Sequence, residues 1–356
     1  MYNEDEINLI TLCSFFQLTY NQRKQLLSGL ENSRPDFVKY EKNLIKTLPA
    51  GVYNKVKADF YDVNYRNKVL ESLKIKGVTC VTYFSEDYPQ ALKNTALPPI
   101  VLYCKGNLKL LKERCFAVVG SRRTLPDITA KTKKIAKELS EKFVVVTGMA
   151  DGADAAVCEG GAQNDRIISV LAYGFDHVYP AVNANLIKIV EKRGLLLSEY
   201  PPEIPPQRHN FPIRNRIIAG LSEGTLIVSA GKKSGALITA EYSEEYGRET
   251  FAFPYGIGVT SGEGCNHIIK NYAHLAENTF DILSYFGLDF KTHGQQTFTP
   301  DEEKLLDAIK ENGASGISEL AEVLGVPPFR LIPVISSLEI KGAVVRLGGN
   351  RYAAAN

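Results

Sequence analysis

Arginine residues at the ends of apolar segments are the first sign of chemistry in this sequence of 356 residues. Arg122 and Arg123 follow Gly120 and Ser121, directly after the apolar run 115–119. Planar guanidinium groups match the geometry of phosphate, and a glycine before a helix lets the backbone approach an anion. This loop therefore predicts a phosphate contact. It lacks the GxGxxG spacing that would indicate a dinucleotide site.

Two later loops repeat this combination of apolar run and cationic residues. The stretch 208–216 holds three arginines and no acidic residue, and its last members are Arg214, Asn215 and Arg216. Burying such a run would require several acidic partners, so a phosphate contact is favoured. After the run 225–229 come Lys232, Ser234, Gly235 and Thr239, a composition that can cradle an anion. The Walker A spacing is absent, so ATP hydrolysis is not indicated.

Two further loops add an aromatic face and small residues. Gly148 follows the apolar run 143–147, and Asn183 follows Tyr179 and Pro180. The Asn183 amide could hydrogen-bond a ligand or begin the next helix, whereas Tyr179 offers a stacking face. Aromatic side chains beside cations are typical of proteins that bind single-stranded nucleic acid.

The elements that must position these loops alternate between apolar runs and helical patterns. We expect strands at 115–119, 143–147, 167–172, 195–198, 225–229 and 250–253. We expect helices at 129–142, 153–163, 185–193, 215–221 and 236–246. This alternation predicts an α/β fold with an extended, Rossmann-like, doubly wound and mostly parallel sheet. Ligands of such sheets bind at the carboxyl ends of the strands, where the loops above meet.

The remaining segments predict smaller domains around the sheet. Helical spacing indicates a small helical domain over residues 1–75, followed by the sheet domain at 76–284 and a linker at 285–296. Residues 297–356 read as three helices and a hairpin with a turn at Gly348-Gly349, which suggests a winged helix. That tail has six basic against eight acidic residues, and its third helix carries only Arg330. A protein contact or a structural role is therefore favoured there over base readout.

Composition bounds the function further. The formal net charge is only +2, so positive charge is focused in loops rather than spread over the surface. The six cysteines are scattered without a CxxC pair, which predicts neither a disulfide framework nor a zinc site and fits the cytoplasm. No apolar run is long enough to span a membrane. We predict no catalytic residue, no metal and no cofactor.

In order along the chain, these motifs resemble the DNA-processing protein A family, also called DprA or Smf. The resemblance covers about residues 80–284. It rests on VVGSRRT (118–124), TGMADGAD (147–154), FDHVYPAVN (175–183), FPIRNRIIAGLS (211–222), SGALITAE (234–241) and GEGCNHIIKN (262–271). The pairing of FPIRNRIIAGLS with SGALIT is the most specific part.

The resemblance implies that the helical domain at 1–75 is SAM-like. It also implies single-stranded DNA binding, homodimerisation through the Rossmann-like domain, and loading of the RecA recombinase during natural transformation. It implies no chemical reaction. Arg122, Arg214, Asn215 and Arg216 correspond to DNA-pocket residues, the glycine loops to backbone contacts, and residues 262–276 to a candidate contact with RecA or a second copy. The family often has a basic residue where Asp151 stands, and an acid there would repel phosphate.

An enzyme that cleaves nucleoside monophosphates at the ribosyl bond is the alternative. In that interpretation Arg216 holds the phosphate and Glu241 serves the ribose. Such enzymes carry a PGGxGTxxE pattern, however, and the corresponding stretch reads SGALITAE.

Overall fold

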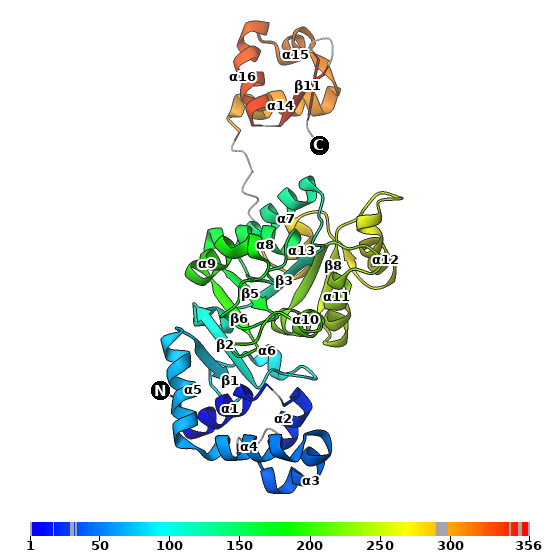
Figure 1. The fold of residues 1–356 in the computed structure, drawn as a ribbon. Helices are drawn as coiled ribbons and strands as arrows, with labels where there is room; N and C mark the ends of the chain where they lie inside the picture. The colour runs from blue at the N-terminus through cyan, green and yellow to red at the C-terminus, as the bar shows by residue number, and fades with distance from the viewer. Residues whose placement is uncertain are drawn as a thin grey trace. The chain divides into compact units, whose positions relative to one another are not determined.

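The chain forms two compact units in a computed structural model, residues 1–288 and residues 289–356. The structure describes residues 2–16, 18–28, 32, 34–289, 298–341, 343–347 and 351–354 (Figure 1).

One large sheet organises the first unit. Its described strands are β1 (Thr79–Thr82), β2 (Val101–Gly106), β3 (Cys115–Gly120), β4 (Val144–Thr147), β5 (Ile167–Leu171), β6 (Leu195–Ser198), β7 (Gly224–Ser229), β8 (Glu249–Ala252) and β9 (His274–Leu275). They lie in the order β1-β2-β6-β5-β4-β3-β7-β8-β9. All neighbours from β6 to β9 are parallel, whereas β1 and β2 add an antiparallel edge. The predicted fold class is confirmed, and the six predicted strands correspond to β3–β8.

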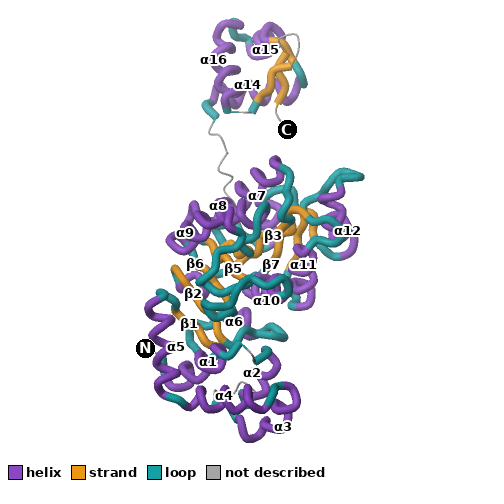
Figure 2. Tube along the Cα trace, in the orientation of Figure 1, coloured by secondary structure: helices purple, strands orange, loops and turns teal. Residues whose placement is uncertain are grey.

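Helices cover both faces of this sheet (Figures 1 and 2). The crossover helices are α7 (Pro126–Leu139), α8 (Ala153–Gly161), α9 (Ala184–Arg193), α10 (Asn210–Leu221), α11 (Gly235–Glu245) and α12 (Glu263–Asn271), and α13 (Thr279–Tyr285) follows the last strand, β9. Side chains of α10, α11 and α12 share one apolar cluster with alternate residues of the strands. The helix predicted at 215–221 begins earlier, at Asn210, so most of the stretch 208–216 is helical rather than loop.

The N-terminal helices pack on the antiparallel edge of the sheet. They are α1 (Glu4–Ser14), α2 (Tyr20–Leu26), α3 (Phe37–Thr47), α4 (Ala50–Tyr61) and α5 (Val63–Ile75), and a short α6 (Gln90–Lys93) follows β1. Their buried side chains form a cluster that also includes Cys80 of β1 and Tyr103 of β2. The predicted helical character of residues 1–75 is present, and a domain boundary at residue 75 stays a prediction.

The second unit contains α14 (Pro300–Asn312), β10 (Ser315–Gly316), α15 (Ile317–Leu324), α16 (Pro328–Ile340), β11 (Val344–Leu347) and β12 (Arg351–Ala354). Its strands form an antiparallel sheet in the order β10-β12-β11. The predicted helices and hairpin strands are present, whereas the turn at Gly348-Gly349 and residues 290–296 of the predicted linker lie outside the described residues. Glu302 is buried at the base of α14, where its carboxylate pairs with Lys341 at 2.6 Å.

No single helix of the described chain is long and apolar enough to cross a membrane. The pair α15 and α16 meets that length and composition together, but the two helices are bent by 110° at their junction.

Candidate nucleic-acid interface

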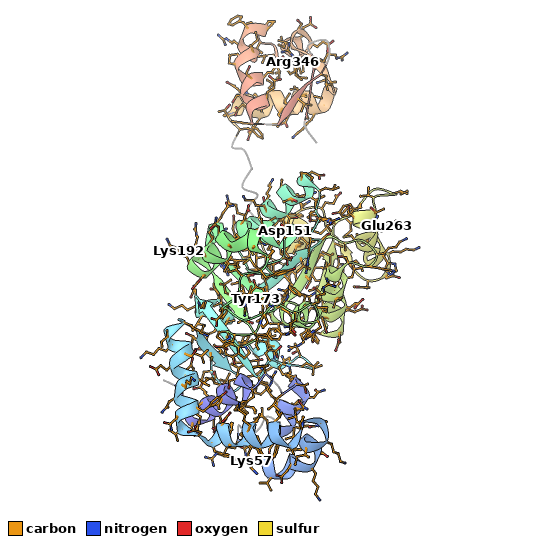
Figure 3. All side chains as sticks on the ribbon, viewed as in Figure 1. Lys57, Asp151, Tyr173, Lys192, Glu263 and Arg346 are labelled. Carbon is orange, nitrogen blue, oxygen red and sulfur yellow. The ribbon has the colours of Figure 1, made fainter. Side chains whose placement is uncertain are left out.

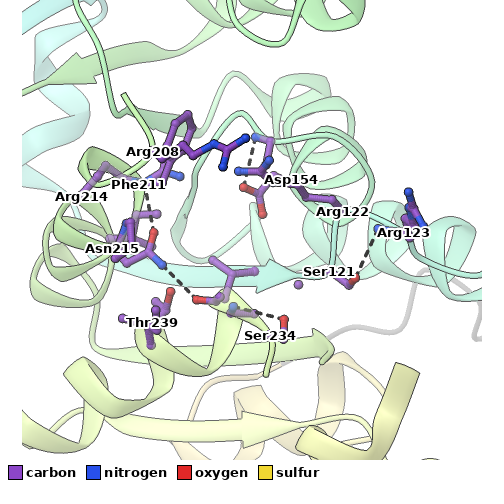
Figure 4. A pocket seen from close by; sticks show the side chains of 18 of the residues that line it. Ser121, Arg122, Arg123, Asp154, Arg208, Phe211, Arg214, Asn215, Ser234 and Thr239 are labelled. Atoms are coloured by element: carbon purple, nitrogen blue, oxygen red, sulfur yellow. Dashed lines mark hydrogen bonds between the residues drawn. The ribbon is translucent and has the colours of Figure 1, made fainter. Parts of the chain in front are cut away.

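A cavity of about 760 Å³ lies where the carboxyl ends of the central strands meet the start of α10 and α11 (Figure 4). Nine of the thirteen predicted residues line it: Gly120, Ser121, Arg122, Arg123, Arg214, Asn215, Ser234, Gly235 and Thr239. Loops that are far apart in the sequence supply these residues because parallel strands present their carboxyl ends at one edge. We refer to this cavity as the arginine pocket.

The floor of the arginine pocket holds a buried pair of opposite charges. Arg214 donates to the Val170 carbonyl and, through Nε, to Asn215 Oδ1 at 3.2 Å. Asp154 Oδ2 accepts from the Ala150 amide at 3.2 Å. Burial raises the pKa of Asp154 and lowers the pKa of Arg214, and the opposite charge of the other residue works against each shift. Their charges therefore largely offset each other.

Gly148 explains how this pair fits beneath the pocket. A Cβ atom at this position would lie 2.4 Å from Asp154 Oδ2 and 2.7 Å from the guanidinium nitrogens of Arg214. A side chain of any size would displace one of the two charged groups. Gly148 is thus needed for packing and does not line the pocket itself.

The rim of the pocket carries positive charge without acidic partners. Arg122, Arg123 and Arg208 are exposed, and within the described residues none of them forms an ion pair. Figure 4 shows Arg122, Arg208 and Asp154 grouped at one side of the pocket, with Ser234 and Thr239 at the other. With four arginines and one aspartate in its lining, the pocket has a net charge of +3.

Two aromatic rings line the same pocket. The Phe211 and Tyr179 ring centroids are 5.5 Å apart, and the Arg122 guanidinium lies 5.3 Å from the Phe211 centroid. The Tyr179 carbonyl accepts from the Tyr173 hydroxyl at 2.5 Å, which fixes the Tyr179 backbone at the rim. A flat ring beside uncompensated arginines can stack a base while its phosphates are held.

The start of α11 forms the opposite wall. Ser234 caps this helix by accepting from the Ala236 amide at 3.3 Å, and the Asn215 amide donates to the Gly235 carbonyl at 3.1 Å. The free amides of a helix N-terminus attract anions. A Cβ atom at Gly235 would meet no atom within 4 Å, so the backbone is open to a ligand there.

Four predicted residues lie elsewhere. Arg216 is buried on the far side of α10, where Nη2 pairs with Glu199 at 2.5 Å and Nη1 donates to the Leu97 carbonyl at 2.7 Å. Asn183 is buried and donates to the carbonyls of residues 149 and 150. Lys232 is exposed outside the pocket lining and lies 3.9 Å from Glu263, and Gly148 packs beneath the floor. None of these four residues lines the arginine pocket.

The pocket lining also includes Arg208 and Tyr179, which the sequence analysis noted within their loops, and Phe211 and Asp154, which it did not single out as ligand contacts. The acid-free stretch 208–216 already pointed to Arg208, and the aromatic residue beside it could have been included for the same reason. Asp154 gave no such signal, because its place depends on the Arg214 contact.

The described part of the chain contains no metal-binding cluster and no exposed cysteine thiol. No group of three or more His, Cys, Asp or Glu side chains could hold a metal ion there, and all six cysteines are buried and free.

Comparison with known proteins agrees with this geometry. The model of the family described as DNA recombination-mediator protein A matches residues 79–287, which include every residue of the arginine pocket. The chain belongs to this family. The resemblance inferred from the sequence motifs is therefore confirmed. The family is one of DNA-processing recombination mediators and not of enzymes, in agreement with the prediction of no chemical reaction.

Relatives of the family cover different shares of the chain. The DNA processing protein DprA of Bacillus subtilis is 41% identical over 190 residues, which are 52% of this chain and 64% of that protein. The protein Smf of Synechocystis is 35% identical over 283 residues, or 76% of this chain and 70% of that protein.

Two solved structures of DprA proteins have the same architecture. The X-ray structure of DprA from Streptococcus pneumoniae has a TM-score of 0.68 at 31% identity and covers 82% of this chain and 99% of that chain. The DprA structure from Helicobacter pylori, described for its single-stranded DNA binding mode, has a TM-score of 0.55 at 28% identity. It covers 60% of this chain and 97% of that one.

Proposed function

We propose that this recombination mediator binds single-stranded DNA in the arginine pocket and loads RecA recombinase onto the bound strand during homologous recombination, including natural transformation. The observation that carries the proposal is the trio of exposed, unpaired arginines around Phe211 and Tyr179. Partnership with RecA would place this activity in the cytoplasm.

Single-stranded DNA fits the pocket better than duplex DNA does. A base can use the Phe211 or Tyr179 ring only when its own face is free, and in a duplex neighbouring bases cover that face. The exposed arginines would hold the phosphates on either side, and the open backbone at Gly235 would allow close approach. The relative from Helicobacter pylori, described for its single-stranded DNA binding mode, supports the same assignment.

The two residues that the nucleotide-cleaving alternative requires, Arg216 and Glu241, do not line the arginine pocket. Arg216 is buried against Glu199, and Glu241 is exposed on α11 without lining the arginine pocket. No phosphate and ribose could therefore meet both residues in one site.

Salt-titrated fluorescence anisotropy with single-stranded and duplex oligonucleotides tests the proposal. We expect tighter binding of the single strand, with log K falling by about 0.7 per phosphate contact for each unit of log salt concentration. Arg122→Ala, Arg123→Ala and Arg208→Ala should each make that slope less steep by up to about 0.7. Arg114→Ala is the matched control, because Arg114 pairs with Glu223 at the other end of β3. Slopes that are unchanged in all three pocket variants would remove the arginine pocket as the DNA site.

We further propose a homodimer through the Rossmann-like domain. In support, β9 is an edge strand, and Leu275, Phe280 and Tyr285 expose apolar surface beside it. Leu275→Lys should shift the protein to monomer in sedimentation velocity while the DNA salt slope stays that of the wild type. A dimer that persists in this variant would exclude the β9 edge.

RecA filament formation on single-stranded DNA, measured with and without this protein, tests the loading step.

We propose that the unit built on α14 to α16 is a winged helix that contacts another protein. Phe329 is 68% exposed and Ile332 is 51% exposed on α16, the helix that would read bases in a DNA-binding winged helix. Arg330 is the only cation in that helix. Truncation after Gln296 should leave DNA affinity unchanged and abolish binding of the partner. Loss of DNA affinity on truncation would contradict this role.

A further inference from the structure

A second hollow of about 560 Å³ lies on the other side of the loop that borders the arginine pocket. Ala150 lines the arginine pocket, and Asp151, the next residue, lines the hollow. The buried Asn183 amide donates to the carbonyls of Met149 and Ala150 at 3.2 Å and 3.1 Å, which fixes the loop between them. A single fixed loop therefore separates the arginine pocket from the hollow.

The lining of this hollow does not suit a phosphate. Its two cations are already paired, Lys133 with Glu159 at 2.7 Å and Arg193 with Asp165 at 2.5 Å. Asp151 forms no ion pair within the described residues, so the uncompensated charge in the hollow is negative. A phosphate would be repelled, whereas a hydrogen-bond donor would be accepted.

The rest of the lining suits a flat, mostly apolar group. Apolar surface comes from Ala155 of α8, from Ala162 directly after α8, and from Leu186 and Ile189 of α9. Asp151 Oδ1 accepts from the Gly152 amide at 2.9 Å, and Oδ2 has no hydrogen-bond partner among the described residues. A carboxylate at the edge of an apolar hollow is the arrangement that accepts the exocyclic amino group of a base.

A cation for the phosphate of the same nucleotide lies next to the hollow. A third, adjoining depression shares Ile189 and Arg193 with it and is also lined by Lys192. Lys192 is exposed and forms no ion pair among the described residues. Figure 3 shows Asp151 near the start of α8 and Lys192 at α9, so base and phosphate partners come from neighbouring elements.

We propose that this hollow accepts a base of the single strand that leaves the arginine pocket, and that Asp151 selects bases with an amino group. Cytosine, adenine and guanine carry such a group, and thymine does not. The inference rests on the proposed DNA-binding function. The proposal explains why an acidic residue, Asp151, stands at a position where it would repel phosphate.

The test compares deoxycytidine with deoxyuridine at single positions walked along an oligo-dT strand. The two bases have the same size, but one presents an amino donor at C4 and the other an oxygen acceptor. With the full chain, we expect deoxycytidine to bind about fivefold more tightly at one position, or about 1 kcal/mol at 1.4 kcal/mol per tenfold. Asp151→Ala should abolish this preference, and Asp151→Lys should reverse it, because a donor replaces the acceptor.

Asp127→Ala is the matched control, because Asp127 is an exposed acid on α7 that lines neither cavity. It should raise the affinity for all oligonucleotides equally and keep the preference. Thermal unfolding confirms that each variant is folded, as expected for changes at exposed side chains.

Equal affinities for the two bases at every position would overturn the inference and leave a basic side chain of another protein as the better occupant. A preference that survives Asp151→Ala would overturn it as well. A chain that binds none of the oligonucleotides would instead overturn the proposed DNA-binding function, so the two failures are distinguishable.

Discussion

Replacement of Arg216 by methionine separates the two interpretations of the FPIRNR motif. Arg216 Nη2 lies 2.5 Å from Glu199 Oε2, and its guanidinium is 5.9 Å from the ring centre of Tyr20. Burial alone would lower the pKa of Arg216, but the charge and hydrogen bond of Glu199 outweigh burial and raise that pKa. Arg216 therefore stays charged, and its removal leaves the Glu199 carboxyl group, whose side chain is 10% exposed, without this partner.

The size of the effect follows from this geometry. Removing one partner of a buried ion pair costs about 3–5 kcal/mol of unfolding free energy. At about 2–4 °C per kcal/mol for a large domain, the melting temperature should fall by roughly 10 °C. A second substitution, Glu199→Gln, removes the unpaired charge, so the double variant should recover a substantial part of that loss.

The assay combines thermal unfolding with salt-titrated DNA binding. Arg216→Met should leave the slope of log K against log salt unchanged, because its side chain contacts no phosphate in the arginine pocket. Arg122→Ala should instead reduce the slope by about 0.7 and leave the melting temperature nearly unchanged. An Arg216→Met protein with a wild-type melting temperature and a reduced slope would refute the reasoning from burial.

The other predictions concern stacking, packing and pH. Phe211→Ala should weaken single-strand binding by about 1–3 kcal/mol at an unchanged salt slope in the same anisotropy assay, because a stacking face is lost and no charge is removed. A changed slope would show instead that an arginine had moved. Gly148→Ala should lower the melting temperature, since its Cβ would lie 2.4 Å from Asp154 Oδ2. In the control Gly51→Ala the new Cβ atom would meet open space, so the melting temperature should not fall. Equal melting temperatures for Gly148→Ala and the wild type would contradict the packing argument. Lys341 is the main cause that lowers the pKa of Glu302 from 4.5 to about 2. The contribution of the Glu302 carboxylate to the stability of the folded unit is therefore complete above pH 4.5 and is lost as the pH falls through about 2. Hydrogen exchange of α14 amides should distinguish Glu302→Gln from wild type at neutral pH and no longer do so below about pH 2, whereas a difference that persists in acid would exclude Glu302 as its source.

The sheet could be predicted because its central strands are buried on both faces. Such strands need near-continuous apolar runs, and β3 to β8 have them, so six strands and their order along the chain followed from the sequence. The edge strands were harder to predict. β9 has only two residues, and so short a run does not distinguish a strand from a loop or a buried turn. Their place in the sheet depends on neighbours that the sequence does not identify.

The arginine pocket could be predicted as a set of loops, because a doubly wound sheet brings the carboxyl ends of its strands together. The role of each residue within those loops was less accessible. Gly148 and Asn183 are residue types that often contact ligands. In this fold Gly148 instead leaves room for Asp154 and Arg214, and Asn183 hydrogen-bonds the loop at residues 149 and 150. Only the contacts of the folded chain distinguish these uses.

Arg214 and Arg216 show why a helix boundary decides the function of a motif. Pro212 suggests a loop before the helix, yet proline is tolerated in the first turn, where its missing amide hydrogen has no partner to lose. The helix therefore starts at Asn210 and passes through both arginines. At 3.6 residues per turn, two residues that are two positions apart point about 200° away from each other. One arginine must then lie beneath the pocket while the other faces the opposite side of α10, and Glu199 is there to neutralise it. A motif with two arginines thus contains one residue that lines the arginine pocket and one that is paired inside the fold.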